Sequence, residues 1–376
     1  MDGIEAVGPE FYGRHDSFRS LEELEFKSMH NWKEWTSPNG NDGEFPCLRR
    51  LMIYYCPKLL GQLPSNLSSL KELYVIDCNA MLFKSMVDLT SLTKFRIERI
   101  SEVTCLPKSF IQSLTTLETL SINICEDLTC LWEEGAEIEQ NLLPFNLKYL
   151  SIRACRALES LLENLGLCTP NLKDLTIGWC ENFKSLPSTM YQLKSLQHLW
   201  MIDCPSIEFI PDGGLPPNLT ELQLWCKNLK RLPNTMYQLT SLQSLDIPGG
   251  ALMSLQRLTI DQKSPLDIVL PSSLTFLHIW DEENLESIPG GLFQNLSSLE
   301  ELWIINCPKL RSLPREAFPP SLGRLCIRGC PHLKRQRFEE KGDYWTLTWS
   351  IPNVEIHEDV YNVIRGWCEP EQAVRI

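Results

Sequence analysis

Residues 48–59 read LRRLMIYYCPKL, and this stretch decides the fold. Its spacing of leucine, isoleucine and cysteine returns in LKYLSIRACRAL at 147–158 and in LEELWIINCPKL at 299–310. Self-similarity at a fixed period indicates a solenoid, in which stacked units share one continuous core. The pattern therefore predicts an extended binding surface and argues against an enclosed catalytic pocket.

The leucines that begin the predicted strands recur about every 23 residues, within the range of about 20 to 29 that is typical of leucine-rich repeats. They are Leu21, Leu48, Leu70, Leu92, Leu117, Leu147, Leu172, Leu196, Leu219, Leu242, Leu255, Leu274, Leu299 and Leu322. We predict an α/β leucine-rich-repeat solenoid, or horseshoe. A parallel β-sheet should form its concave face, with loops and short helical or 3-10 turns on its convex face.

Strand geometry explains the spacing, because successive side chains of a strand point to opposite faces. In the unit that starts at Leu172, Leu175 and Ile177 are expected to point into the core, and Thr176 and Gly178 to point outward. One unit buries too little apolar surface to offset the conformational entropy of its backbone. Neighbouring units must therefore stack.

The predicted organisation has four parts. Residues 1–20 form a lead-in, 21–333 hold about fourteen repeats, 334–360 form a C-terminal cap, and 361–376 form a tail expected to be disordered. The interval of 13 residues between Leu242 and Leu255 predicts one shortened unit. No capping segment is recognised before the first repeat, so Leu24 and Phe26 are expected at an exposed end of the solenoid.

The chain has fifteen cysteines, and most of them follow the repeat. Nine occupy the same step, where a small and readily buried side chain suits the turn that follows the strand: Cys56, Cys78, Cys125, Cys155, Cys180, Cys204, Cys226, Cys307 and Cys330. A disulfide framework is the alternative, although it is typical of small secreted chains. Cys326, Cys330 and His332 resemble a zinc site in spacing, but the repeat places Cys326 on an outward position.

Composition limits the possible functions. A net charge of −13 disfavours binding to nucleic acid or to anionic membranes. The first residues have no apolar signal core, and no run of 18 apolar residues could span a membrane. We expect a cytoplasmic protein, with the nucleus as a further possible location.

No catalytic motif is found in the sequence. Phosphate-binding loops, dinucleotide fingerprints, zinc-protease motifs and nucleophile elbows are all missing. The shallow sheet of a solenoid also encloses side chains poorly. We expect no enzyme activity, no cofactor and no metal.

Aromatic and arginine side chains stand out among the predicted outward strand positions, and these residues are typical of protein-interaction hot spots. The candidates are Tyr54, Tyr74, Arg96, Tyr149, Arg153, Trp179, Trp200, Trp225, Trp280, Trp303, Arg324 and Arg328. The alternative is that the tryptophans fill grooves between neighbouring strands and stiffen the sheet.

The repeat form L-x-x-L-x-I-x-x-C-P-x-L-x-x-L-P, with Leu-Pro at 63–64, 186–187 and 313–314, resembles that of plant intracellular nucleotide-binding leucine-rich-repeat disease-resistance proteins. EFYG at 10–13 and SFRSLEELEFKSMHNWKEW at 17–35 resemble the coiled-coil-type branch of this family. KGDYW at 341–345 and IPNVEI at 351–356 resemble its terminal segment, so the likeness covers residues 3–357.

Such receptors carry a signalling domain and a nucleotide-binding switch ahead of the repeats, and neither is found in this sequence. The resemblance implies only the role of the repeats: recognition of a pathogen effector or guarded host protein, and restraint of the switch domain. The alternative is a general adaptor scaffold, or a truncated receptor product without signalling activity.

Overall fold

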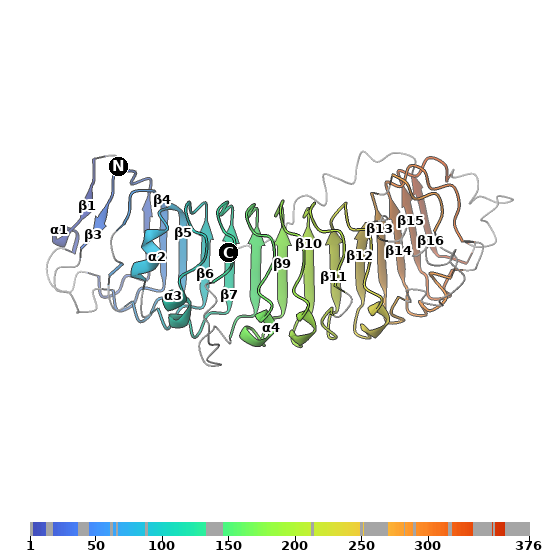
Figure 1. Ribbon diagram of the computed structural model, residues 1–376, viewed down its shortest axis with the longest axis horizontal. Coiled ribbons are helices and arrows are strands. Elements are labelled where there is room, and N and C mark those ends of the chain that lie inside the picture. The colour runs from blue at the N-terminus through green and yellow to red at the C-terminus, as the bar shows by residue number, and fades with distance from the viewer. Residues whose placement is uncertain are drawn as a thin grey trace. The chain divides into compact units, whose positions relative to one another are not determined.

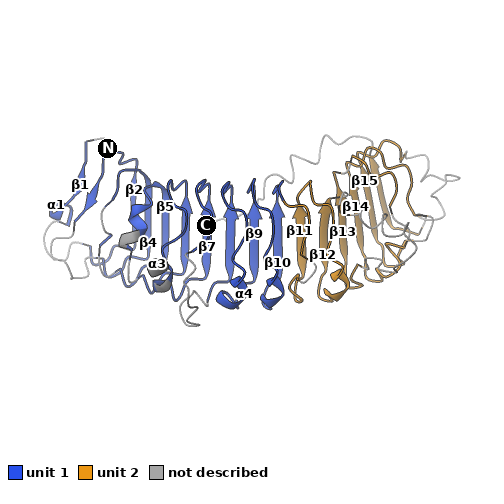
Figure 2. Cartoon of the chain, in the orientation of Figure 1, with its two compact units in different colours: residues 1–206 blue, residues 207–376 orange. Residues whose placement is uncertain are grey.

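The computed structural model describes residues 3–12, 18–36, 45–60, 63–64, 67–86, 89–132, 146–211, 214–248, 251, 270–281, 283–288, 291–314, 318–333, 348 and 350–357. The chain forms two compact units, residues 1–206 and residues 207–376 (Figure 2). The expected tail at 361–376 lies outside the described residues.

Unit 1 is built mainly of short strands. Its elements are β1 (Ala6–Val7), α1 (Pro9–Tyr12), β2 (Glu23–Lys27), β3 (Glu34–Trp35), β4 (Arg50–Cys56), β5 (Glu72–Cys78), α2 (Met81–Ser85), β6 (Lys94–Glu98), α3 (Lys108–Ser113), β7 (Thr119–Asn123), β8 (Tyr149–Arg153), α4 (Leu165–Cys168), β9 (Asp174–Gly178), the 3-10 turn η1 (Met190–Gln192) and β10 (His198–Ile202). The main sheet runs in the order β2-β4-β5-β6-β7-β8-β9-β10, with α3 and α4 beyond the lower strand ends in Figure 1.

Unit 2 repeats this design. Its elements are β11 (Glu221–Trp225), the 3-10 turn η2 (Met236–Gln238), β12 (Ser244–Pro248), β13 (Phe276–Trp280), β14 (Glu301–Ile305), β15 (Arg324–Arg328) and β16 (Asn353–His357). Its strands follow one another in chain order and pair in parallel. The predicted α/β repeat fold with a parallel sheet is confirmed within each unit.

Strand starts follow the leucine spacing closely. Strand β10, for example, starts at His198, two residues after Leu196, and β14 starts at Glu301, two residues after Leu299. The unit expected at Leu255 lies outside the described residues. The strands before and after it, β12 and β13, pair directly from Ser244 with Phe276 to Pro248 with Trp280. Strand β16 adds a rung within the segment that the sequence predicts as a C-terminal cap.

An aromatic cluster covers the first rung of unit 1. Phe26 packs against Phe11, Trp32 and Trp35 at ring-centre distances of 5.7, 4.7 and 4.9 Å. The indole N–H of Trp35 donates to the Tyr12 hydroxyl at 2.7 Å. The expectation that Phe26 is exposed is therefore wrong, because aromatic rings from the lead-in and from the first repeat bury its ring to 7% exposure.

The repeated cysteines are buried, and most of them have a specific polar role. Eight of the nine are the seventh residue counted from the start of their strand, and there the thiol donates to the carbonyl oxygen two residues earlier in the chain, as in Cys56 to Tyr54 at 3.3 Å and Cys180 to Gly178 at 3.4 Å. Cys226 is the sixth residue from the start of β11, so its assignment to the same step is wrong. A thiol is a weak donor that packs like a small apolar group. Cysteine therefore fills the core while capping the end of the strand.

One disulfide lies outside this cysteine series. Cys105 and Cys130 are joined, with Cα atoms 5.1 Å apart and 25 residues between them in sequence. Neither cysteine occupies the repeated strand-end step, so the pattern of buried thiols could not predict their pairing. The sequence left a disulfide framework open as an alternative. Among the described residues, the structure contains this one disulfide.

The sixth residue of a rung, counted from the first residue of its strand, has a recurrent left-handed backbone; we call it the turn position. The turn positions with positive φ are Ser28, Tyr55, Asp77, Arg99, Ile124, Ala154, Trp179, Asp203, Asp281, Asn306 and Gly329. Most non-glycine residues avoid this region. Here the bend directs the backbone N–H toward the neighbouring rung, as from Ile124 to the Arg153 carbonyl at 2.8 Å.

Candidate functional site

The outward face of each unit consists of the first, third and fifth side chains of its strands. Burial alternates along most strands as the predicted pattern requires, with the second and fourth residues inside. Several outward positions depart from this pattern, on β9, β12, β14 and β15. Thr176 and Gly178 of β9 are buried, although they lie on the outward face.

Ion pairs link side chains of the first strands of unit 1. Arg50 donates to Glu23 at 2.7 Å and to Glu72 at 2.8 Å. The Tyr74 hydroxyl donates to Glu72 at 3.0 Å. Burial, strengthened by the hydrogen bond to Glu72, raises the pKa of Tyr74 to about 12. Burial also raises the pKa of Tyr54, so both predicted tyrosines stay neutral hydrogen-bonding groups at physiological pH.

The next basic side chains of this face also have acidic partners. Arg96 donates to one oxygen of Glu98 at 2.7 Å, and Arg99 donates to the other at 2.9 Å. The Arg99 guanidinium lies 5.7 Å from the ring centre of Tyr55 and donates to its hydroxyl at 3.3 Å. Both oxygens of Glu98 are therefore occupied within this part of the sheet.

Arg153 has a different environment. Its guanidinium lies 5.6 Å from the ring centre of Trp179, and its Nε is buried without an acceptor. Burial, with a smaller repulsion from Arg96, lowers the pKa of Arg153 from its ordinary value. The side chains of Tyr149 and Trp179 are 44% and 45% exposed, so the structure brings two accessible aromatic rings to the strands that carry this cation.

Trp200 lies at the other end of the unit 1 sheet. Its ring stacks on that of His198, with the ring centres 6.3 Å apart. The Nδ1 atom of His198 lies 2.5 Å from a carboxylate oxygen of Asp174. The Trp200 indole N–H is buried and has no acceptor in the described part of the chain. The stacking contact of Trp200 with His198 lies within its own strand.

In unit 2 the outward face is dominated by aromatic rings. Trp225 and Trp280 meet edge to face at 6.2 Å. Between their strands lies Asp246, which contacts the ring of His278 at 3.0 Å and is 4% exposed. Trp303 packs against both His278 and Phe276, at 6.2 and 6.0 Å.

The last rungs of unit 2 combine an aromatic ring with paired charges. The Arg324 guanidinium lies 5.4 Å from the ring centre of Trp303, whose indole N–H donates to Glu301 at 3.0 Å. Glu355 accepts from Arg324 at 2.8 Å and from Arg328 at 3.0 Å. These two arginines hold the pKa of Glu355 below its ordinary value.

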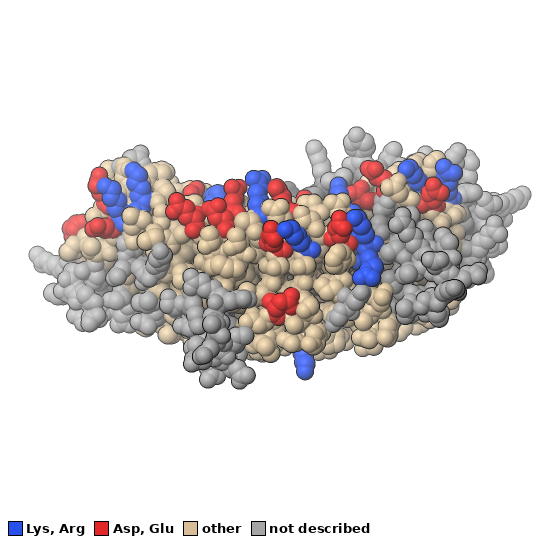
Figure 3. Space-filling view, viewed as in Figure 1, with Lys and Arg blue, Asp and Glu red and all other residues tan. Residues whose placement is uncertain are grey.

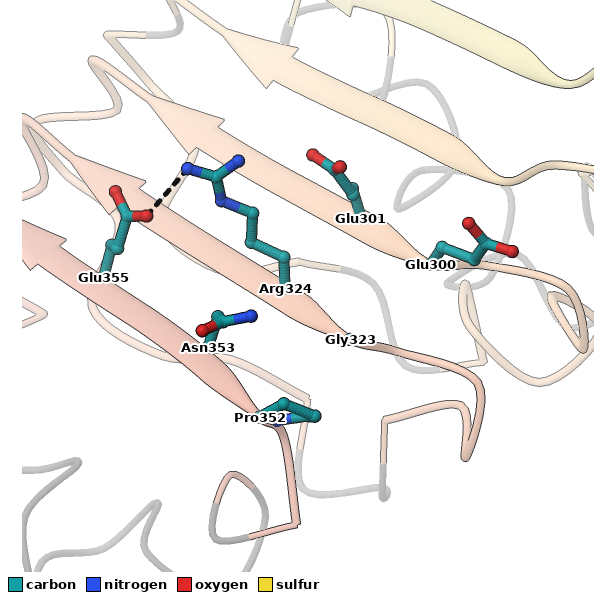
Figure 4. A pocket seen from close by; sticks show the side chains of 7 residues that line it. All are labelled: Glu300, Glu301, Gly323, Arg324, Pro352, Asn353 and Glu355. Carbon is teal, nitrogen blue, oxygen red and sulfur yellow. Dashed lines mark hydrogen bonds and ion pairs between the residues drawn. The ribbon is translucent and has the colours of Figure 1, made fainter.

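A shallow pocket of about 540 Å³ opens over this end of the sheet (Figure 4). Its lining residues are Glu300, Glu301, Gly323, Arg324, Pro352, Asn353 and Glu355. Figure 4 shows the Arg324 side chain reaching toward Glu355, so the arginine among the described lining residues is already paired within the chain.

Cys326 shows why an outward position need not be accessible. It pairs in register with Trp303 on one side and Glu355 on the other, and it is fully buried. Burial raises the pKa of this thiol and so favours its protonated form. In the described part of the chain, no three His, Cys, Asp or Glu side chains gather closely enough to hold a metal ion.

Lysine and arginine lie among aspartate and glutamate on the visible face, without a large block of one sign among the described residues (Figure 3).

The structure brings the predicted outward residues together in separate groups. Trp225 lies beside Trp280, Arg324 and Arg328 meet at Glu355, and Arg153 lies beside Trp179.

Sequence reasoning missed the side chains at the turn positions other than Trp179. Tyr55 and Ile124 are 38% and 37% exposed there, next to the outward face. A bulky residue immediately before the repeated cysteine is the signal that could have found them, as in Tyr55-Cys56 and Ile124-Cys125.

Comparison with known proteins gives the family of these repeats. Plant disease resistance proteins described as RPS2-like, leucine-rich repeats, match residues 17–165. A disease-resistance protein of Arabidopsis thaliana is 30% identical over 350 residues, covering 88% of this chain and 23% of the relative. The RPP13-like protein 1 of the same plant is 31% identical over 210 residues, covering 52% of this chain and 17% of the relative.

The chain is a leucine-rich-repeat domain of the plant disease-resistance type. It spans about a fifth of the length of the two relatives above. Among solved structures, the leucine-rich-repeat domain of the type III effector XopL is 26% identical, with a TM-score of 0.45, over 58% of this chain and 72% of that one. No helix in the described part of this leucine-rich-repeat domain is long and apolar enough to cross a membrane.

Proposed function

We propose that this leucine-rich-repeat domain recognises a protein during plant immunity, through the outward face of its sheet. The partner would be a pathogen effector or a guarded host protein, and the same surface could instead restrain a nucleotide-binding switch domain. The names of the relatives support a role in disease resistance. A cytoplasmic location and a purely non-catalytic role are parts of this proposal.

One observation carries the proposal. Tyr149 and Trp179 expose nearly half of their large side chains, and Trp179 lies beside the half-buried cation of Arg153. Aromatic side chains next to arginine are enriched at the centres of protein interfaces. The other predicted tryptophans are less accessible and mainly contact their neighbours within the sheet.

Alanine variants of the exposed aromatic residues can test the site. A two-hybrid screen of the chain against pathogen effectors and host proteins would supply binding partners, which are then measured with the purified variants Y149A and W179A. Tyr191 of η1 is a matched control, because it is 49% exposed but lies outside the strands.

We expect Y149A and W179A each to weaken binding about 10-fold or more, as hot-spot truncations do, and Y191A to leave it unchanged. Because Trp200, Trp225 and Trp303 are also candidates, their triple alanine variant tests the rest of the outward face. If every partner binds all these variants with unchanged affinity, recognition uses another surface and the proposal is wrong.

A further inference from the structure

The arginines of the outward face differ in one respect, namely whether they have an acidic partner. Arg50, Arg96, Arg324 and Arg328 each pair with at least one carboxylate. No carboxylate of the described residues pairs with Arg153, and its contact with Trp179 is with the face of a ring. In a chain with a net charge of −13, an unpaired cation is unexpected.

Strand register explains why Arg153 has no partner. Across the sheet it lies between Asn123 and Gly178, neither of which carries a charge. The adjacent outward row is Ser121, Ser151 and Thr176, which are also neutral. Glu98 shares the row of Asn123 and Arg153, but it is two strands away, about 10 Å, and Arg96 and Arg99 already occupy it.

Burial makes this arrangement costly for the free protein. The Nε of Arg153 is shielded from solvent and has no acceptor, and a buried donor left unpaired loses its bonds to water without replacement. Guanidinium stays charged at all physiological pH values. Arg153 as a whole is only half-buried, so a carboxylate of a ligand that reaches the rest of the guanidinium would gain a charge-assisted hydrogen bond, which is among the strongest in proteins.

We propose that Arg153 binds a carboxylate side chain, Asp or Glu, of the protein partner, with the exposed ring of Trp179 as the apolar wall of the contact. This inference rests on the proposed function and adds the chemical class of the residue that is recognised.

The first test concerns the free protein and needs no partner. Replacing Arg153 by methionine keeps most of the apolar stem and removes the unpaired charge, so the Tm of R153M should equal or exceed that of the wild type. R50M is the matched control, because it leaves half-buried Glu72 without its arginine and should lower the Tm. A Tm lowered as far as in R50M would show that the guanidinium has a carboxylate partner within the chain, and would overturn the proposal.

The second test uses a defined probe. The full chain, labelled with 15N at the arginine Nε, is titrated with a capped hexaglutamate peptide, a capped hexaglutamine peptide and inorganic phosphate. Hexaglutamate should shift the Arg153 signal, which is assigned by its loss in R153M, and should bind R153M about 10-fold more weakly. R50M should bind hexaglutamate like the wild type.

Three results would count against a carboxylate site: equal binding of the two peptides, equal weakening in R50M, or a phosphate response as strong as that of hexaglutamate. A partner from the two-hybrid screen separates this inference from the proposed function. If that partner loses affinity for W179A but not for R153M, recognition by the outward face stands and the carboxylate contact fails. Recovery of binding when R153E meets a partner variant with Lys in place of its acidic residue would support the contact.

Discussion

The backbone N–H of Trp179 donates to the carbonyl oxygen of Ile202 at 2.7 Å, from a residue whose φ is 54°. The same link joins Ile124 to Arg153 and Gly329 to His357. Many rungs are thus tied to the next by a hydrogen bond from a left-handed turn position. The side chain at that position is held outward, whatever its type.

This geometry predicts opposite effects of glycine at two turn positions. Ile124 is β-branched with φ 53°, the residue class least suited to this region. Ile124→Gly should stabilise the domain by up to about 1 kcal/mol, because relief of strain of about 1 to 2 kcal/mol exceeds the added freedom of the unfolded chain. Gly329→Ala, at φ 64°, should destabilise it by about 1 kcal/mol. Urea denaturation followed by circular dichroism measures both, and stabilisation by Gly329→Ala would refute the argument.

The phenylalanine cluster of unit 1 should be sensitive to truncation. Phe110 is fully buried and packs against Phe95 and Phe83 at 5.2 and 5.9 Å. Phe110→Ala should cost about 3 to 5 kcal/mol in the free energy of unfolding, through lost burial and the cavity that remains. Tyr191→Ala should change it by no more than about 0.5 kcal/mol, because its side chain is exposed. Equal losses in the two variants would contradict this packing.

Thiol reactivity should separate the cysteines by burial. Burial raises the pKa of Cys125 to about 11 and that of Cys180 to about 12, whereas Cys47 is exposed. Since the thiolate is the reactive species, iodoacetamide at pH 8 should modify Cys47 within minutes and leave the other two unmodified in the folded protein. Peptide mass spectrometry provides the measurement. Rapid labelling of Cys180 in native buffer would be inconsistent with its place in the core.

Acid should loosen the last strand of unit 2. The pKa of Glu355 is held below its ordinary value by Arg324 and Arg328, so the folded state binds this proton less readily than the unfolded state. The stabilisation is complete above the ordinary glutamate pKa, and is lost as the pH falls through the lowered one. Hydrogen-exchange protection of residues 353–357 should therefore drop between about pH 5 and pH 3.

Glu355→Gln tests the origin of this acid sensitivity. The variant should show weaker protection of β16 already at pH 7, with a smaller further change on acidification. Glu208→Gln is a suitable control, because Glu208 pairs with Lys230 at the surface, far along the chain from β16. If E355Q keeps the full acid response, other groups control the strand.

Much of the fold can be predicted from the spacing of leucines along the sequence. Strands start two residues after the predicted leucines, since alternation of apolar side chains assigns a face to each position. The exposure of outward residues depends instead on partners in other rungs. Thr176, Gly178 and Cys326 all occupy outward positions and are buried, because large neighbours on the adjacent strands cover them.

The candidate site was predictable as a set of residue types but not in all of its contacts. Arg153 and Arg96 look alike in the sequence, each at an outward position of its own strand. Arg96 meets Glu98, which lies two residues later on its own strand, so local sequence shows this pair. The neutral neighbours of Arg153, Asn123 and Gly178, lie on other strands, and only the register of the sheet reveals them.

The buried cysteines should also determine how the folded protein is irreversibly inactivated. Each thiol is protected while its rung is folded, and the pKa values of Cys125 and Cys180 make them unreactive there. Unfolding of a unit releases several thiols together, their pKa returns to the ordinary range, and in air they cross-link before the rungs can re-form. When the protein is heated without a reductant, its inactivation should therefore be irreversible. The half-life of the folded state is then set by the rate of unfolding.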